Sequence, residues 1–364
     1  MARLSSRADL LDRLTNLSAL DPDDMIGPAI AFPEQCQQAW ESGCGFRLAS
    51  RTTPKVLAVT GMGGSGVGGL LLAKLYDGRC SVPIVANRDY TVPASVGRDA
   101  LLFAVSYSGD TEETLAATKQ ALDAGARVIC LTTGGKLAKL AARYPRRTQV
   151  LTVPAGFSPR AALGHLFFPM LALTAQLGLL GRGGIAAVER EVTETLRLLR
   201  RMSQELHLDV PVARNEAKQL AHFLHGCFPI VYGGTGLMGV AAYRWRTQLN
   251  ENSNTIASHH EFSELDHNEI QGWRGGNPGL PRPALIVLRS KGESKRMAER
   301  IKITLDILGR RLHRREVEAR GASPLAQVLS AVYVGDFASI YLAYLNRVDP
   351  TEIDNIRQLK KALG

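Results

Sequence analysis

The chain has 364 residues and carries 44 Lys and Arg against 34 Asp and Glu, which gives a formal net charge of +10. Hydrophobic residues make up 45% and charged residues 21%, an ordinary globular composition that excludes a mainly disordered or fibrous chain. The length predicts two domains. Five scattered cysteines without a CxxC pair argue against a disulfide framework or a zinc site, and favour a reducing compartment.

The basic charge by itself would suit nucleic acid, an anionic membrane or a small anionic substrate. Aromatic residues make up only 6% of the chain. We interpret the densest basic run, residues 310–315, as a solvated helix end or loop. We therefore expect neither a nucleic acid nor a membrane as a partner. No apolar run with a cleavage site lies near the start, which predicts a cytoplasmic protein. The most apolar stretch, residues 161–180, contains His165, Pro169 and Gln176, and predicts a buried helix or helix pair.

The first half of the chain predicts a helical segment followed by a strand–helix alternation. Residues 1–50 place Leu10, Leu11, Leu14 and Leu17 at helical spacing. We then expect strands at residues 54–60, 82–86, 100–106, 127–132 and 149–153, and helices at 68–75, 112–124 and 136–142. Continuous apolar strands between amphipathic helices indicate a parallel sheet that is covered on both faces.

The second half repeats this theme after a helical stretch at residues 185–206. We expect strands at residues 227–232, 283–288 and 314–318, the last at a sheet edge, and helices at 239–249, 295–308 and 326–345. The fold class is therefore α/β, with two doubly wound parallel-sheet domains. The expected organisation is a helical segment over 1–50, a first domain over 51–184, a linker helix and second domain over 185–348, and a tail over 349–364 with a closing helix.

A glycine cluster, residues 61–69, follows the first strand. Gly61, Gly63 and Gly66 fit GxGxxG, but no acidic residue ends the next strand, as a dinucleotide site would require. No Gly-Lys-Ser/Thr closes the cluster, so it is not a Walker A loop. A tight turn and a ligand-binding turn both remain open.

The segment 106–114, Ser-Tyr-Ser-Gly-Asp-Thr-Glu-Glu-Thr, follows another strand and opens a helix. An ordinary helix cap needs one such side chain. Hydroxyls at Ser106, Ser108, Thr111 and Thr114 exceed that need. Because a phosphate monoester is bound by several converging N–H and O–H donors, the sequence predicts an anion site here.

Three further groups could carry chemistry. Arg160 follows a proline and precedes an apolar helix, where it could be a surface charge or could steady a developing enediolate or a phosphate. Glu251 and His267 lie 267 − 251 = 16 residues apart, and we expect them on separate loops, as a carboxylate base and a histidine acid/base for proton transfer. The surrounding His and acidic residues match no metal-binding spacing.

These segments occur in the order seen in bifunctional phosphoglucose/phosphomannose isomerases, and the chain resembles that family over nearly its whole length. The resemblance rests on the glycine cluster, the hydroxyl-rich segment, Pro159-Arg160, Asn250-Glu251, His267-Asn268-Glu269 and the lysine-containing end of the chain. The resemblance implies two sugar-isomerase (SIS) domains, a small sugar-phosphate substrate, no metal and no cofactor. It also implies a homodimer in which the partner subunit's histidine completes each active site.

The resemblance further implies roles for single residues. Glu251 would move a proton between C1 and C2 through a cis-enediol, Arg160 would stabilise the enediolate, and His267 and Lys360 would assist ring opening. Substrate binding would fall to Gly63, Gly64, Ser65, Ser106, Ser108 and Thr111. Lys361 stays an alternative to Lys360, and Thr351 is a candidate for admitting the mannose epimer.

The resemblance implies an isomerase that interconverts glucose 6-phosphate, and also mannose 6-phosphate, with fructose 6-phosphate. Two other functions compete with this interpretation. A non-catalytic sugar-phosphate sensor on the same domains would keep the hydroxyl-rich segment but would need neither Glu251, His267 nor a terminal lysine. A nicotinamide-dependent dehydrogenase would rest on the glycine cluster alone, and the missing ribose-binding acid disfavours it.

Overall fold

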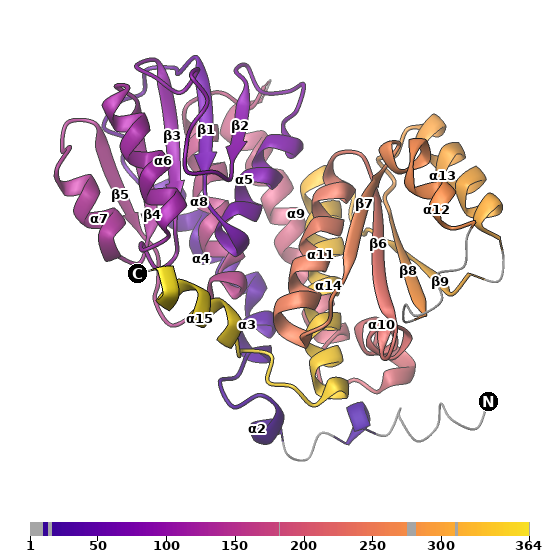
Figure 1. Cartoon of the computed structure of the whole chain (residues 1–364). Coiled ribbons are helices and arrows are strands. Elements are labelled where there is room, and N and C mark those ends of the chain that lie inside the picture. The colour runs from indigo at the N-terminus through magenta and orange to yellow at the C-terminus, as the bar shows by residue number, and fades with distance from the viewer. Residues whose placement is uncertain (1–9, 14–16, 182, 275–281, 310–311, 364) are drawn as a thin grey trace. The chain divides into compact units, whose positions relative to one another are not determined.

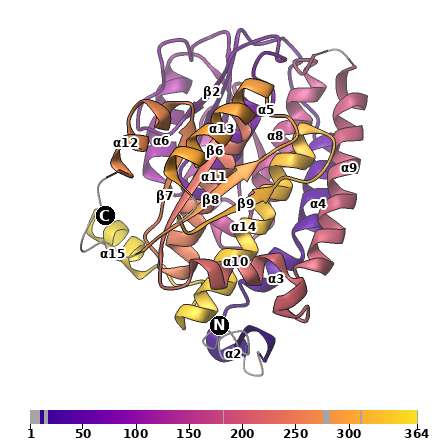
Figure 2. The same ribbon diagram turned by 90° about the vertical axis from the view of Figure 1, so that its right-hand side faces the viewer.

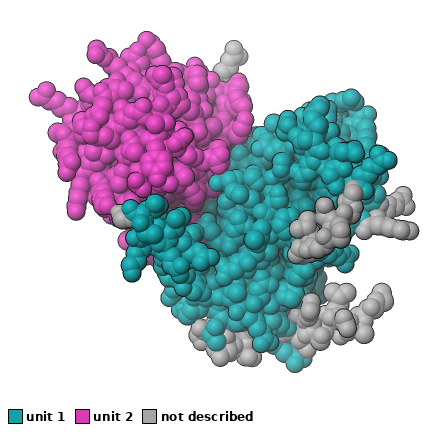
Figure 3. Space-filling model, viewed as in Figure 1, with its two compact units in different colours: residues 1–30, 197–364 teal, residues 31–196 magenta. Residues whose placement is uncertain are grey.

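The computed structural model describes the chain except for residues 1–9, 14–16, 182, 275–281, 310–311 and 364. Leu14 and the first two residues of the basic run therefore lie outside the described residues. The chain divides into two compact units (Figure 3). Unit 1 comprises residues 1–30 and 197–364, and unit 2 comprises residues 31–196. The domain boundaries expected from the sequence stay predictions.

Unit 2 contains a five-stranded sheet in the order β2-β1-β3-β4-β5, with every pairing parallel (Figure 1). The strands are β1 (Val56–Thr60), β2 (Ile84–Asn87), β3 (Ala100–Val105), β4 (Arg127–Thr132) and β5 (Thr148–Thr152). The central strand β3 is buried at every position, which explains its uninterrupted apolar sequence. The predicted parallel sheet is confirmed.

Both faces of this sheet are covered by helices. The helical elements are α4 (Phe32–Gly45), α5 (Gly63–Leu75), α6 (Glu112–Asp123), α7 (Gly135–Ala142), η1 (Pro159–Ala161) and α8 (Leu163–Gln176), and α9 (Gly184–Glu205) crosses from one unit to the other. Ala58, Leu102 and Val128 pack in one cluster with residues of α6 and α7. Their neighbours Leu57 and Phe103 are buried too, and side chains alternate between the faces of a strand, so the second face is covered as well.

Helix α5 begins at Gly63, five residues before the expected start at residue 68. The glycine cluster is thus the first turn of a helix as well as a turn after β1. A Cβ on Gly64 would lie 2.7 Å from Arg160 Cα, and one on Gly69 would lie 2.8 Å from Val59 Cγ1. The glycines are needed because other parts of unit 2 approach the α5 backbone this closely.

Unit 1 contains a four-stranded sheet in the order β7-β6-β8-β9, again with parallel pairings. The strands are β6 (Phe228–Gly234), β7 (Ser258–Phe262), β8 (Pro283–Arg289) and β9 (Arg314–Glu318). The sequence did not predict β7, because Ser-His-His-Glu-Phe is an edge strand without an apolar run. The expected edge strand over 314–318 and the α/β fold class are confirmed.

The helical elements of unit 1 are α2 (Leu17–Leu20), α3 (Ile26–Ile30), η2 (Val212–Arg214), α10 (Glu216–Leu224), α11 (Leu237–Ser253), η3 (Glu264–His267), α12 (Glu269–Gly272), α13 (Lys295–Leu308), α14 (Pro324–Asn346) and α15 (Asp354–Leu363). Helix α14 packs against α10 and α11 (Figure 2). Among the described residues it is the one helix long and apolar enough to cross a membrane, but it is buried from Leu325 to Leu345. Such burial is what a core helix requires.

Candidate functional site

In unit 2, the loop from β3 to α6 carries the hydroxyl-rich segment. Ser106 is completely buried, and its Oγ lies 2.9 Å from Thr111 Oγ1. The same Oγ accepts a hydrogen bond from the Gly109 N–H at 3.1 Å. The Asp110 N–H donates to Ser108 Oγ at 3.3 Å. These bonds fold residues 106–111 into a compact turn at the carboxyl edge of the sheet, where ligands of such folds bind.

The turn is locked to the segment that precedes α7. Gly109 has φ +77°, and a Cβ there would lie 2.0 Å from the Gly134 carbonyl oxygen, so only glycine fits. The Leu137 N–H donates to the Gly109 carbonyl at 2.8 Å, and the Thr133 N–H donates to the Tyr107 carbonyl at 2.9 Å. The turn therefore keeps its shape before any ligand arrives.

The start of α6 is suited to an anion. Thr111 is the N-cap residue, yet its side chain makes no capping bond to the helix. Ser108 is exposed and Thr111 is half-buried, so both hydroxyls can be reached from solvent. The N-terminal N–H groups of a helix and its dipole favour negative charge. Together with the hydroxyls they make a set of donors that is able to hold a phosphate group.

Two other predicted segments meet this turn within unit 2. Ser65 Oγ accepts a hydrogen bond from the Tyr107 N–H at 3.3 Å. Gly64 lies against the backbone of Pro159 and Arg160, and the Arg160 side chain is buried. The structure thus brings the glycine cluster, the hydroxyl-rich segment and Arg160 together.

In unit 1, Glu251 lies in the last turn of α11, and the expectation that it sits on a loop is wrong. Helix α11 continues to Ser253 because Asn252 and Ser253 are buried, and it ends at Asn254, which adopts the left-handed conformation with φ +49°. Asn is one of the few residues besides Gly that tolerates this conformation. The helix thus fixes the position of the backbone from which the Glu251 side chain extends.

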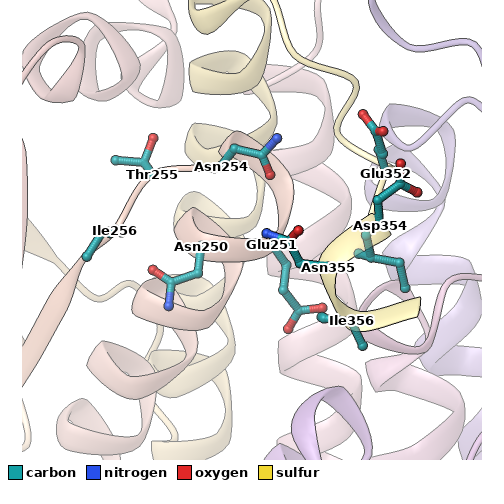
Figure 4. A pocket seen from close by; sticks show the side chains of 10 residues that line it. Asn250, Glu251, Asn254, Thr255, Ile256, Glu352, Asp354, Asn355 and Ile356 are labelled. Carbon is teal, nitrogen blue, oxygen red and sulfur yellow. The ribbon is translucent and has the colours of Figure 1, made fainter. Parts of the chain in front are cut away.

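Glu251 lines a cavity of about 540 Å³ (Figure 4). The opposite wall comes from the C-terminal segment. The lining residues are Asn250, Glu251, Asn254, Thr255, Ile256, Glu352, Ile353, Asp354, Asn355 and Ile356. Three of them carry carboxylates, and none is Lys, Arg or His. The cavity therefore suits the neutral, hydroxyl-bearing part of a ligand better than an anionic part.

Helix α11 is held in place by polar contacts with α14. The buried Arg244 and Asp336 form a bidentate pair, with Nε to Oδ1 at 3.1 Å and Nη2 to Oδ2 at 2.9 Å. Burial raises the pKa of Asp336, and the Arg244 charge opposes this shift. Asn252 Nδ2 donates to Ser339 Oγ at 2.9 Å, one residue after Glu251. Because these contacts lie on either side of Glu251 in the sequence, they leave the end of α11 little freedom to move.

The other predicted residues of unit 1 do not line this cavity. His267 ends the short helix η3 rather than lying on an open loop, and it is exposed. Lys360 and Lys361 are exposed on α15, and Thr351 is half-buried just before that helix. The structure thus gives Glu251 a cavity in unit 1 without His267 or either lysine among its lining residues.

Sequence reasoning missed the α15 side of the cavity. Asp354, Asn355 and Ile356 form the first turn of α15, and Glu352 and Ile353 directly precede it. A signal was available, since an acidic and amide-rich stretch stands a few residues before the lysines that the resemblance singled out. Within the described parts of the chain, no group of three or more His, Cys, Asp or Glu residues could hold a metal ion.

Comparisons with known proteins agree with this description. A family model described as "Bacterial phospho-glucose isomerase C-terminal SIS domain" matches residues 213–363. The bifunctional phosphoglucose/phosphomannose isomerase of Caldicellulosiruptor bescii is 40% identical over 336 residues, which cover 92% of this chain and 97% of that protein. The protein of the same name from Aquifex aeolicus is 32% identical over 334 residues, 90% of this chain and 95% of that protein.

A solved structure supports the fold. The C-terminal domain of glucosamine-fructose-6-phosphate aminotransferase from Francisella tularensis superposes with a TM-score of 0.69. The match covers 90% of this chain and 98% of that one at 15% identity. At this identity the likeness bears on the fold alone, and it agrees with two parallel α/β sheets in one chain.

Proposed function

The chain belongs to the family of bifunctional phosphoglucose/phosphomannose isomerases, and on that basis we propose that it interconverts glucose 6-phosphate and mannose 6-phosphate with fructose 6-phosphate. The observation that carries the proposal beyond family membership is the cavity in which Glu251 lies at the end of a well-anchored helix. A carboxylate there can take and return a proton at carbon, which is the central step of an aldose–ketose isomerisation.

Unit 2 holds the phosphate in this proposal. The accessible hydroxyls of Ser108 and Thr111 and the first N–H groups of α6 bind the phosphate oxygens. The buried Ser106 hydroxyl takes part through its hydrogen bond to Thr111, which orients the Thr111 hydroxyl. The preformed turn supports this role, because binding a phosphate then requires little further ordering of the chain. Gly63, Gly64 and Ser65 line the sugar side, and binding energy from the phosphate orients the reacting carbons.

Unit 1 supplies the proton transfers. Glu251 removes the proton from C2 of the open aldose, and the C–H electron pair forms the C1–C2 double bond while the C1 carbonyl oxygen takes up a proton, which gives a cis-enediol. Glu251 then returns its proton to C1 as the C2 hydroxyl loses a proton and becomes the ketose carbonyl, so that one proton passes from the C2 oxygen to the C1 oxygen overall. Arg160 of unit 2 stabilises the negative charge that develops on oxygen. His267 and Lys360 assist the opening of the sugar ring before this step, with Lys361 as the alternative lysine.

We further propose a cytoplasmic homodimer in which each active site uses His267 of the partner subunit. The exposure of His267 and its absence from the Glu251 cavity support this arrangement. A histidine supplied by the partner has to be accessible on the surface of its own subunit. Dilution below the dimer dissociation constant should then lower the specific activity.

The test is the Glu251→Gln variant, assayed with both aldose 6-phosphates by NMR without added metal. We expect kcat to fall by about 10³-fold or more, because an amide cannot accept the carbon-bound proton. The dissociation constant for fructose 6-phosphate, measured by calorimetry, should stay within about threefold, since the amide keeps the carboxylate's shape. Glu299→Gln on the exposed face of α13 is the matched control and should leave both quantities unchanged.

Two results would contradict the proposal. A wild-type protein that binds the sugar phosphates but does not turn them over would indicate a sensor. A Glu251→Gln variant with full activity would remove Glu251 from the mechanism while leaving the isomerase function intact.

A further inference from the structure

His267 sits on a short irregular segment that needs support from elsewhere in unit 1. The helix η3 spans only four residues, Glu264–His267, and α12 begins two residues later at Glu269. Segments this short do not hold their own shape in water. The side chains that bracket His267, however, are tied to three other elements of the unit.

Asp266, directly before His267, is bound to α13. Its Oδ2 lies 3.1 Å from Arg300 Nη1, and its Oδ1 accepts a hydrogen bond from Thr304 Oγ1 at 2.8 Å. Arg300 and Thr304 are one helical turn apart, so both reach the same carboxylate. The Asp266 side chain is only 8% exposed. A carboxylate so far removed from water requires such partners.

Glu269, two residues after His267, is bound to the sheet. Tyr232 of β6 donates its hydroxyl to Glu269 Oε1 at 2.5 Å, and Trp273 Nε1 donates to the Tyr232 oxygen at 2.8 Å. His260 Nε2 of β7 lies 3.1 Å from Glu269 Oε2. Burial and the Glu269 charge raise the pKa of Tyr232, so its hydroxyl keeps its proton and remains a donor.

We propose that Asp266 and Glu269 are positioning residues that fix the His267 imidazole for proton transfer to the sugar ring oxygen. This inference rests on the proposed function. The two carboxylates hold the backbone on either side of His267, which leaves mainly side-chain rotation free. A displacement of about 1 Å at an acid/base group can lower a rate by about a hundredfold, so anchoring of this kind matters for catalysis.

The decisive experiment is a double-mutant cycle on kcat with Asp266→Asn and His267→Gln. Asp266→Asn alone should lower kcat about tenfold and change KM less than about twofold, because substrate binding does not use the imidazole. In the His267→Gln background it should lower kcat no further, since the residue through which it acts is gone. A fully additive cycle would overturn the proposal, because a merely structural residue acts independently of His267.

Glu269 is tested in the same way. Glu269→Gln can still accept from the Tyr232 hydroxyl but loses its charge facing His260. We expect a drop in kcat of about threefold to tenfold that also disappears in the His267→Gln background. An unchanged kcat, or a drop that persists without His267, would remove Glu269 from the proposal.

Variants of α13 distinguish the loss of this anchor from a general loss of folding. Thr304→Val removes one hydrogen bond to Asp266 and should lower kcat about threefold, whereas Thr304→Ser keeps the hydroxyl and should restore it. Asp306→Asn, which disturbs only an exposed pair with Lys302 on the same helix, is the matched control. Equal losses in Thr304→Ser and Thr304→Val would overturn the anchoring role.

A readout independent of turnover separates this inference from the proposed function. The imidazole resonances of His267, assigned in ¹⁵N-histidine protein with the His267→Gln variant, should be sharp in the wild type and broadened or shifted in Asp266→Asn. An inactive wild type with that spectral change would contradict the isomerase function alone. An active enzyme with unchanged resonances in Asp266→Asn would contradict the positioning role alone.

Discussion

The two units share a parallel α/β architecture but present different chemistry. Unit 2 offers hydroxyls and backbone N–H groups at the start of α6, in a turn locked by Gly109. Unit 1 offers Glu251 in a cavity lined by carboxylates and amides. Neutral hydroxyl and N–H donors can bind an anion, whereas removing a proton from carbon requires a base, for which a carboxylate is suited. This difference underlies our proposal that unit 2 anchors the substrate and unit 1 performs proton transfer.

The largest effect that tests this comparison of the two units is expected in unit 2, at the turn that Gly109 locks. In Gly109→Ala the new Cβ would meet the Gly134 carbonyl, and we expect a loss of about 3 kcal/mol in unfolding free energy and a large rise in KM. Gly178→Ala is the matched control, because Gly178 has φ +72° but no atom within 4 Å of its Cβ position. It should lose only about 1 kcal/mol, from backbone strain.

Chemical denaturation and steady-state kinetics measure both effects. Equal destabilisation in the two alanine variants would mean that the close approach to Gly134 does not shape the turn. A normal KM in Gly109→Ala would separate the turn from phosphate binding and would remove the anchoring role from unit 2.

The sequence predicted the alternating parallel sheets well, because strands such as β3 are apolar throughout. It failed at β7 and at the end of α11, where polar residues dominate. The buried Asn252 extends α11 through its contact with Ser339, a residue 87 positions later. Such long-range pairing leaves no local pattern. For the same reason the α15 wall of the cavity could not be read from the residues near Glu251.

The two units also differ in how a fall in pH should affect their stability. In unit 2, burial lowers the pKa of His165 to about 4, so the folded state holds this ring neutral. The unfolded chain then binds more protons between about pH 6.5 and pH 4, and stability falls as the pH drops through this range. In unit 1, the raised pKa of Asp336 has the opposite sign, because the folded state binds the extra proton.

We therefore expect wild-type protein to lose about 2 kcal/mol more than His165→Phe between pH 7 and pH 5, through His165 alone. Urea unfolding of the two proteins at both pH values measures this difference, in which all other titrating groups cancel. Parallel losses in the two proteins would show that His165 is protonated in the folded state.

At single-residue scale, Ser108→Ala should raise KM for fructose 6-phosphate about tenfold and leave kcat nearly unchanged. One hydrogen bond to a charged phosphate contributes about 1.5 kcal/mol, and it forms equally in the ground and transition states. Ser95→Ala is the matched control, since Ser95 is exposed in the loop before β3, at the other end of that strand. A fall in kcat without a change in KM would assign the Ser108 hydroxyl to the chemistry rather than to the anchor.

The smallest effect is expected at the carboxylates that face Glu251 across its cavity. Glu352 and Asp354 should repel an anion at the reacting end of the substrate and tolerate a neutral one. In the double variant Glu352→Gln/Asp354→Asn, arabinonate 5-phosphate should therefore inhibit about threefold more strongly, while arabinitol 5-phosphate, which lacks the carboxylate, should be unaffected. The double variant Glu299→Gln/Asp306→Asn makes the same change in net charge on the exposed side of α13. If it strengthened inhibition equally, the effect would belong to the overall field of the protein. If the gain is confined to the cavity variant and fades in high salt, unit 1 selects the uncharged end of the sugar, as the contrast with unit 2 requires.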